Sequence, residues 1–343
     1  MNKIVIDSAI PYIKGVFEPY FSEVKYLPGR NITHNDVEEA NALIVRTRTK
    51  CDENLLADTD VEIVASPTIG TDHIDIKTLF KNGVVVVNAP GCNAGGVLQY
   101  VYTTLFYVAQ QKNIDLRGKT IGVIGAGNTG GRVYKYAPDF YLQHLENDPK
   151  REKREGSEEF CSLDYLLANS DIVSCHVPLD KTTFRMADAE FFSKMKDGAI
   201  FINASRGEIV VEEDLIAAAR AGKFSAMILD VWNNESSGIS KELLELADIA
   251  TPHIAGYSIE GKINGTVMVV RALASYFGIR ELSNFSIDNE MSSPLKLNFS
   301  QAEILKQMLD IFPVLELDKL LRDKPENFEK IRTEYKLRHE FQL

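Results

Sequence analysis

The sequence has 343 residues, a formal net charge of −11 at pH 7, 45% hydrophobic residues and 25% charged residues. The length predicts more than one domain, and the composition is that of a globular protein with buried hydrophobic cores. The acidic balance argues against nucleic acid and anionic membranes as partners, because both would repel the surface. A small anionic ligand would therefore need a local cluster of basic side chains.

The four cysteines, Cys51, Cys92, Cys161 and Cys175, are scattered without metal-binding spacing. We expect reduced thiols in a cytoplasmic protein and no bound metal. The N-terminus begins directly on a strand-like run, and no apolar run approaches the ~20 residues that span a bilayer. We therefore expect neither a signal peptide nor a membrane span.

The first ninety residues alternate between short apolar runs and helical segments. Strands are predicted at 3–7, 24–27, 42–45, 62–65 and 84–87. Helices are predicted at 11–20 and 36–40, and the alternation indicates a self-contained α/β unit. The long, mostly apolar segment 94–111 predicts a helix that joins two domains or buries a face in a partner subunit.

A cluster of basic residues follows the predicted strand 42–45. Arg46, Arg48 and Lys50 are interleaved there with two threonines. Open α/β sheets bind ligands beyond the C-terminal ends of their strands, which makes this loop a candidate anion site. A solvated basic loop is the alternative.

The stretch 120–131 reads TIGVIGAGNTGG, which predicts a strand, a glycine turn and a helix. In this context G-x-G-x-x-G is typical of a dinucleotide site. Gly125 permits the tight turn, Gly127 lets a pyrophosphate approach the backbone, and Gly130 allows close helix–strand packing. The helix N-terminus offers unpaired N–H groups and partial positive charge to phosphates. The alternative is a glycine-rich turn whose close packing serves only the fold and binds no nucleotide.

An acidic residue is expected downstream of this motif to meet the adenosine ribose hydroxyls. Asp148 lies 18 residues after Gly130, close to the required place. A carboxylate there favours NAD over NADP, because it repels a 2′-phosphate. Glu146 is a second candidate for this role. Alternatively, Asp148 forms a turn before a proline and has no role in cofactor binding.

The second half of the chain continues the same alternation. Strands are predicted at 141–146, 171–176, 199–203, 226–231 and 249–251. Helices are predicted at 212–221 and 264–277, and the charged run 150–159 is expected to be a solvated loop. After residue 284 come polar turns, a helix at 302–309 and a charged tail. We predict two Rossmann-like, doubly wound parallel-sheet domains and a small C-terminal α+β extension.

Three polar residues, Arg206, Glu235 and His253, each follow a predicted strand. Parallel strand ends lie along one edge of a sheet, so these side chains are expected near one another. A guanidinium grips a carboxylate, an imidazole exchanges protons near neutral pH, and a neighbouring carboxylate orients the imidazole. With a hydride acceptor, this set would oxidise a 2-hydroxy acid or reduce a 2-oxo acid. Taken singly, each residue could instead be an ordinary surface or loop residue.

Several stretches resemble the ordered signatures of the D-isomer-specific 2-hydroxyacid dehydrogenases over about residues 1–280. The matching stretches are 125–130, 201–207, 229–232 and 252–256, and within the family the more specific ones are 45–50, 70–73, 89–94 and 253–262. The resemblance implies NAD as cofactor, a phosphorylated hydroxy acid as substrate, and a homodimer. It also implies a substrate-binding domain of residues 1–93 and 255–280, an NAD-binding domain of residues 94–254, and a dimerisation-type extension of residues 281–343.

The resemblance also implies roles for individual residues. Arg206 would bind the substrate carboxylate and C2 oxygen, His253 would take the C2 hydroxyl proton as hydride leaves, and Glu235 would hold His253. The implied cofactor contacts are Gly125, Gly127, Asn128, Thr129, Gly130, Asp148, Asp230 and Gly256. The implied substrate contacts are Thr47, Thr68 and Tyr257. From their charge, we add Arg46, Arg48 and Lys50 as candidates for neutralising the phosphate.

Two departures from the family pattern leave alternatives open. Ser236 stands after Glu235 where the family usually has proline, so we expect a looser loop. The C-terminal region is short for a dimerisation domain. The alternatives are another member of the family, such as one acting on phosphoglycerate, and a non-catalytic NAD(H)-sensing protein on the same fold.

Overall fold

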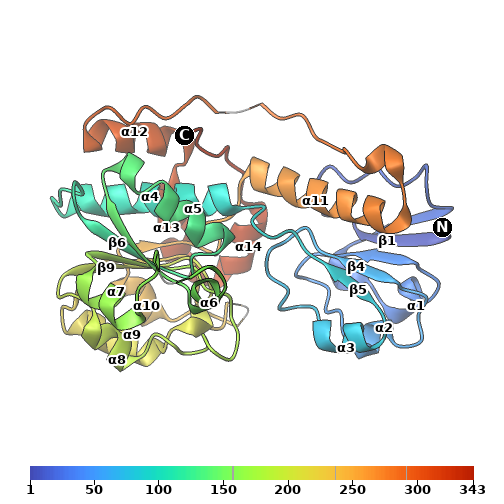
Figure 1. Cartoon of the computed structure of the whole chain (residues 1–343), viewed down its shortest axis with the longest axis horizontal. Coiled ribbons are helices and arrows are strands. Elements are labelled where there is room, and N and C mark those ends of the chain that lie inside the picture. The colour runs from blue at the N-terminus through green and yellow to red at the C-terminus, as the bar shows by residue number, and fades with distance from the viewer. Residues whose placement is uncertain (157, 236, 291) are drawn as a thin grey trace. The chain divides into compact units, whose positions relative to one another are not determined.

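The computed structural model describes residues 1–156, 158–235, 237–290 and 292–343. The chain divides into two compact units (Figure 1). The first consists of Met1–Asn93 and Ile259–Glu290, and the second of Ala94–Ser258 and Met291–Leu343. No helix within the described ranges combines the length and apolar character that a bilayer span requires.

The first unit is built on a five-stranded parallel sheet with the order β2–β1–β3–β4–β5. Its strands are β1 (Lys3–Asp7), β2 (Glu23–Leu27), β3 (Ala42–Ile44), β4 (Ile63–Ala65) and β5 (Val85–Val87). Its helices are α1 (His34–Val37), α2 (Glu53–Leu56), α3 (Ile76–Lys81) and α11 (Ile259–Phe277). Successive strand residues alternate between two buried cores, one against α11 and one against α1, α2 and α3.

The second unit contains a six-stranded parallel sheet with the order β11–β10–β9–β8–β6–β7. Its strands are β6 (Thr120–Ile124), β7 (Gln143–Asn147), β8 (Ile172–Cys175), β9 (Ala199–Asn203), β10 (Phe224–Leu229) and β11 (Ile249–Ala250). The strand order reverses between β6 and β8, which is where doubly wound sheets bind dinucleotides. The predicted fold class and strand positions of both sheets are confirmed.

Helices cover both faces of this second sheet. The helices of this unit are α4 (Ala94–Gln111), α5 (Asn128–Lys135), α6 (Pro149–Glu155), α7 (Leu163–Asn169), α8 (Ala189–Lys194), α9 (Glu212–Arg220), α10 (Lys241–Leu246), α12 (Gln301–Ile311), α13 (Val314–Asp323) and α14 (Phe328–Glu334). Short 3₁₀ helices lie at Gly29–Asn31, Pro138–Phe140, Gly207–Ile209, Arg280–Leu282 and Pro325–Asn327.

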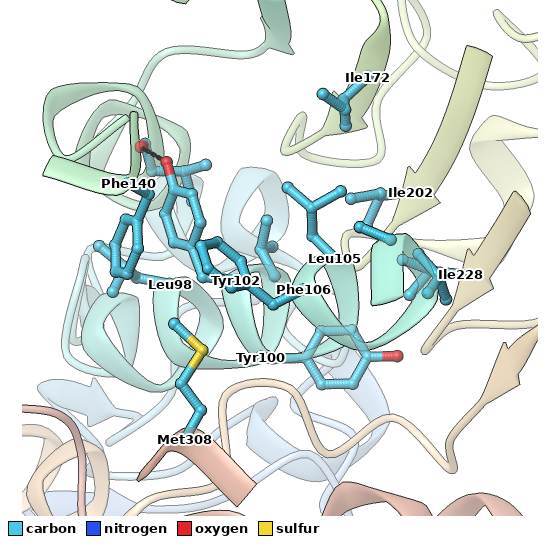
Figure 2. Close-up of a cluster of buried hydrophobic side chains, with 14 of the residues drawn as sticks. Leu98, Tyr100, Tyr102, Leu105, Phe106, Phe140, Ile172, Ile202, Ile228 and Met308 are labelled. Carbon is cyan, nitrogen blue, oxygen red and sulfur yellow. Dashed lines mark hydrogen bonds between the residues drawn. The ribbon is translucent and has the colours of Figure 1, made fainter. Parts of the chain in front are cut away.

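Helix α4 is almost entirely buried in the core of the second unit. Figure 2 shows its aromatic and leucine side chains close to Ile172, Ile202 and Ile228 of the sheet and Met308 of α12. Tyr102 stacks on Phe140 with ring centroids 3.9 Å apart. The apolar pattern of 94–111 is therefore satisfied within this unit, by the sheet and by α12, without a partner subunit.

Three local predictions are wrong. Residues 11–20 form turns instead of a helix, because Tyr12 and Gly15 adopt positive φ angles of 62° and 88°. The run 150–159 begins as helix α6, which Asp148 caps and whose first residue, Pro149, is suited to a helix start. Ser157, in the same run, lies outside the described residues.

The third wrong prediction concerns the C-terminal extension, which is helical. Helices α12, α13 and α14 make up its regular structure, and its β structure within the described residues is limited to isolated bridges at Pro294 and Arg338. Buried side chains from α12, α13 and α14 join the cores of the second unit, so amphipathic helices suit this position better than strands.

The packing of α12 on α4 predicts a measurable loss of stability. Met308 is fully buried, and Met308→Ala should lower the free energy of unfolding of the second unit by about 2–4 kcal/mol, because it leaves a cavity. Trp232, the sole tryptophan, is buried in this unit, so its fluorescence in a urea titration reports the change. The exposed Lys306→Ala on the same helix should change it by less than about 0.5 kcal/mol. Equal effects of the two substitutions would contradict the packing.

Candidate active site

The glycine turn after β6 has the close packing that its motif predicts. Gly125 has φ +87°, and a Cβ there would lie 2.8 Å from Val177 Cγ1 and 2.9 Å from the carbonyl of His176. A Cβ on Gly130 would collide with the carbonyl oxygen of Gly125. These two glycines are thus required for the turn to lie under the first turn of α5.

Gly127 differs from these two glycines, because a Cβ at its position would meet no protein atom within 4 Å. It is the N-cap of α5, and both it and Asn128 are exposed, while Thr129 is half-buried. The first N–H groups of α5 and the positive end of its dipole therefore face an open space. This geometry fits the pyrophosphate of a dinucleotide.

Asp148 directly follows β7, which pairs with β6 in parallel register. Its Oδ1 accepts a hydrogen bond of 3.0 Å from the backbone N–H of Arg151. The Arg151 guanidinium in turn donates to the carbonyl of Ala126 at 2.6 Å. Asp148 is thereby fixed at a strand end beside the glycine turn, where a ribose contact is expected.

Glu146, the rival for that role, is buried within β7 and only 4% exposed. It lines a cavity of about 460 Å³ together with Tyr134, His144 and Phe160. Burial raises the pKa of Glu146 to about 7. Asp148, by contrast, lies after the end of the strand, and its contact with the ribose stays a prediction.

The side chain of Asp230 holds the loop that carries His253 in its conformation. Its side chain is wholly buried, and its two oxygens accept hydrogen bonds from the Thr251 hydroxyl and from the N–H groups of Ile254 and Ala255, at 2.7–2.8 Å. The N–H of His253 donates to the Asp230 carbonyl at 2.7 Å. In this structure Asp230 acts on the loop, and its contact with the nicotinamide end stays a prediction.

Glu235 and His253 are in direct contact. Both carboxylate oxygens lie 2.9 Å from His253 Nδ1. Burial alone would raise the pKa of Glu235, but the His253 hydrogen bond and the charges of His253 and Arg332 outweigh it and lower that pKa. An ionised carboxylate only accepts, so Nδ1 carries a proton and Nε2 is left to exchange one with a ligand. Ser236, where a looser loop was expected, lies outside the described residues.

Arg206 follows β9, the neighbour of β10 in the sheet. The Asn203 side chain shapes its turn, accepting from the N–H and hydroxyl of Ser205 and donating to the Arg206 carbonyl at 3.0 Å. A Cβ on Gly207 would collide with the Trp232 backbone, which explains glycine there. Arg206, Glu235 and His253 thus follow three adjacent strands, β9, β10 and β11, as the sequence predicts.

The other predicted substrate contacts are divided between the units. In the first unit, Arg46 follows β3, and its Nε donates to Oδ2 of the buried Asp7 at 3.0 Å. Thr68 follows the adjacent β4, and its hydroxyl donates to the Gly70 carbonyl. Thr47 is exposed. The structure thus places Arg46, Thr47 and Thr68 after neighbouring strands of the first sheet.

Of the two other basic candidates, Arg48 is half-buried, and Lys50 pairs with Asp52 at 2.8 Å, with 80% of the lysine side chain exposed. Tyr257 and Gly256 lie in the second unit, in the loop that begins at His253. The Tyr257 hydroxyl accepts a hydrogen bond of 3.1 Å from Arg332 Nε.

Sequence reasoning does not find two arginines that act on this loop. Arg338 is 5% exposed and donates to the carbonyls of Gly96, Ala255 and Tyr257 at 2.7–3.0 Å. Arg332 contacts Glu235 and Tyr257. Both lie in the charged tail, where no motif or periodicity separates them from surface arginines.

The chain is similar to known proteins over nearly its whole length. Residues 103–255 match the model of the D-isomer specific 2-hydroxyacid dehydrogenase, NAD binding domain. An erythronate-4-phosphate dehydrogenase of Bacteroides fragilis (strain YCH46) is 41% identical over 98% of this chain and 97% of its own length. One from Yersinia enterocolitica is 36% identical over 99% and 93%.

Solved structures are also similar to most of this chain. A D-lactate dehydrogenase of Aquifex aeolicus, complexed with NAD and lactic acid, has a TM-score of 0.68 and 28% identity, covering 84% of this chain and 100% of its own. An NAD⁺-bound 3-phosphoglycerate dehydrogenase of Entamoeba histolytica has a TM-score of 0.68 and 25% identity, covering 84% and 99%. The open space at Gly127 therefore fits NAD.

The glycine turn gives a second prediction. Gly127→Ala should weaken NADH binding by about tenfold or more, because its Cβ would stand where the pyrophosphate approaches the backbone. The unfolding midpoint should not change, since no protein atom lies within 4 Å of that Cβ. Titration of NADH fluorescence and urea unfolding test the two parts. Gly130→Ala is the matched comparison and should lower stability; unchanged NADH affinity in Gly127→Ala would contradict the site.

Proposed function

Because the chain belongs to the D-isomer-specific 2-hydroxyacid dehydrogenase family and is an NAD-dependent oxidoreductase, we propose that it oxidises 4-phospho-D-erythronate at C2. The product is (R)-3-hydroxy-2-oxo-4-phosphobutanoate, in the biosynthesis of pyridoxal phosphate (vitamin B6). The choice of substrate is supported by the similarity to erythronate-4-phosphate dehydrogenases over 98–99% of the chain. The observation that carries the chemistry is the contact between Glu235 and His253.

His253 is the general base of this oxidation, and Glu235 orients it. Nε2 of His253 takes the proton of the C2 hydroxyl as the C2 hydrogen leaves with its electron pair, so that C2 becomes a carbonyl. NAD, when bound, accepts this hydride. Glu235 accepts from Nδ1–H throughout and stabilises the imidazolium that forms. In the reverse direction His253 returns the proton.

Arg206 orients the other end of the reacting centre. Its guanidinium pairs with the substrate carboxylate and the C2 oxygen, where negative charge develops as the hydroxyl proton leaves. The interactions that Asn203 makes with Ser205 and Arg206 hold the turn in one shape. This prior ordering lowers the entropy cost of aligning C2 with the base.

The substrate phosphate is neutralised by Arg46, Arg48 and Lys50, with Thr47, Thr68 and Tyr257 as further substrate contacts. Arg46 is fixed by the buried Asp7. The Lys50–Asp52 pair is exposed to solvent, and exposed pairs of this kind are weak, so Lys50 can exchange this partner for phosphate. A basic loop of this kind supports a phosphorylated substrate and does not fix its chain length.

Two other functions are compatible with parts of this reasoning. Oxidation of D-3-phosphoglycerate would use the same catalytic residues and the same basic loop. A non-catalytic NAD(H) sensor would need only the glycine turn. The intact set of Arg206, Glu235 and His253 argues against the sensor.

Formation of NADH from NAD should be faster with 4-phospho-D-erythronate than with D-3-phosphoglycerate. A 2-oxo acid is included in the assay so that tightly held NADH does not block a second turnover.

His253→Ala should abolish turnover and leave the affinity for NADH within about twofold, because the substitution removes Nε2 and leaves the glycine turn intact. His34→Ala, a histidine of α1, is the control. Preference for phosphoglycerate would change the substrate, and full activity of His253→Ala would refute the general base.

The family resemblance also supports a homodimer in the cytoplasm. Helix α4, whose apolar pattern suits either a join between domains or a face buried in a partner subunit, is covered by the sheet and α12 of its own unit, so the dimer face lies elsewhere. No disulfide is present among the described cysteines, which fits a reducing compartment. Light scattering after size-exclusion chromatography should give twice the 38.4 kDa of one chain; a mass of one chain at micromolar concentration would refute the dimer.

A further inference from the structure

Arg332 of helix α14 reaches the Glu235–His253 pair from the C-terminal extension. Its Nη1 lies 3.6 Å from Glu235 Oε2, and its Nε donates to the Tyr257 hydroxyl at 3.1 Å. The guanidinium carbon lies 5.7 Å from the centroid of the Tyr257 ring. The arginine side chain is only 15% exposed. A residue nearly one hundred positions after Glu235 therefore supplies a fixed positive charge beside the carboxylate that holds the imidazole.

The placement of Arg332 depends on how the extension packs. Phe328 and Ile331 of α14 and Leu321 of α13 are buried in the same core as strands β8, β9 and β10. Arg322 of α13 pairs with Asp318 and donates to the carbonyls of Leu244 and Ala247. These contacts make α13 and α14 part of the second unit.

Several polar groups meet at the Glu235 carboxylate. His253 hydrogen-bonds the carboxylate, Arg332 lies beside it, and the N–H of Trp232 donates to it at 3.3 Å. The same Nη1 of Arg332 also lies 3.5 Å from Glu329 Oε1. The Arg332 cation favours ionised Glu235 and disfavours a second positive charge on the imidazole. Arg332 thus acts on the acid–base pair electrostatically as well as by fixing Tyr257.

We propose that Arg332 is a positioning residue through which the C-terminal extension completes the acid–base site of the second unit. It keeps the Glu235 carboxylate charged and in place, sets how readily the imidazole takes a proton, and holds the Tyr257 side chain. The proposal rests on the proposed function, because it assigns Glu235 and His253 as the orienting group and the base.

The test compares Arg332→Leu with Arg332→Lys. Loss of the cation should lower kcat/KM by about tenfold at neutral pH and move the acidic limb of its pH profile upward, because the imidazolium is no longer repelled. Lysine keeps the charge and should restore most of the pH profile, although it lacks the planar fork that meets Glu235 and Tyr257 together. An unshifted profile in a folded Arg332→Leu protein would overturn the proposal.

Arg322→Leu is the matched control for the packing of the extension. It removes the Asp318 pair and the bonds to two carbonyls without touching the Glu235–His253 pair. It should lower the unfolding midpoint and leave the pH profile unchanged. If it shifts the profile as Arg332→Leu does, the effect belongs to packing and the proposal is wrong.

A readout that does not need turnover separates this proposal from the proposed function. In histidine-labelled protein without substrate, the NMR signal of the His253 ring, assigned by its absence in His253→Ala, should titrate at a higher pH in Arg332→Leu than in the unsubstituted protein. That shift would support Arg332 even if no tested hydroxy acid were oxidised, and its absence would refute Arg332 even if turnover were normal. If the leucine variant does not fold, Arg332→Gln removes the charge while keeping a polar group and decides the question.

Discussion

The buried carboxylate of Asp230 sets the geometry of the loop that carries His253. Removing a charge from water is costly unless hydrogen bonds replace the lost hydration. Burial raises the pKa of Asp230, while the nearby His253 and the hydrogen bonds from Thr251, Ala255 and Ile254 oppose that rise. The same bonds tie the loop after β11 to the end of β10. A single buried group therefore ties the segment after β10, which leads to Glu235, to the loop after β11, which carries His253.

His253 itself adopts a strained backbone conformation. Its φ of 55° lies in the left-handed region, which costs a non-glycine residue roughly 1–2 kcal/mol. The bond from its N–H to the Asp230 carbonyl and the bonds of the next two residues to the Asp230 side chain hold it there. This conformation accompanies the contact of Nδ1 with Glu235, which leaves Nε2 for the ligand.

The C-terminal segment also holds the loop that carries His253. Arg338 binds the carbonyls of the loop at Ala255 and Tyr257 and that of Gly96 in α4, and its guanidinium stacks 3.7 Å from the Phe312 ring centroid. The loop is thus held by Asp230 through its N–H groups and by Arg338 through its carbonyl groups. Arg332 then brings a positive charge to Glu235. A segment with the composition of a charged tail thus stabilises the loop that carries His253.

The sequence by itself determined the two parallel sheets, the glycine turn at Gly125, and the placement of Arg206, Glu235 and His253 after adjacent strands. These features follow from local rules, because apolar periodicity sets strands, glycine alone tolerates the turn, and parallel topology aligns strand ends. Only the tertiary structure decided that Glu146 is buried while Asp148 caps α6 beside the glycine turn, that Asp230 anchors a loop, and that Arg332 meets Glu235. Those outcomes depend on packing between residues far apart in the chain, and no local pattern of side chains encodes such distances.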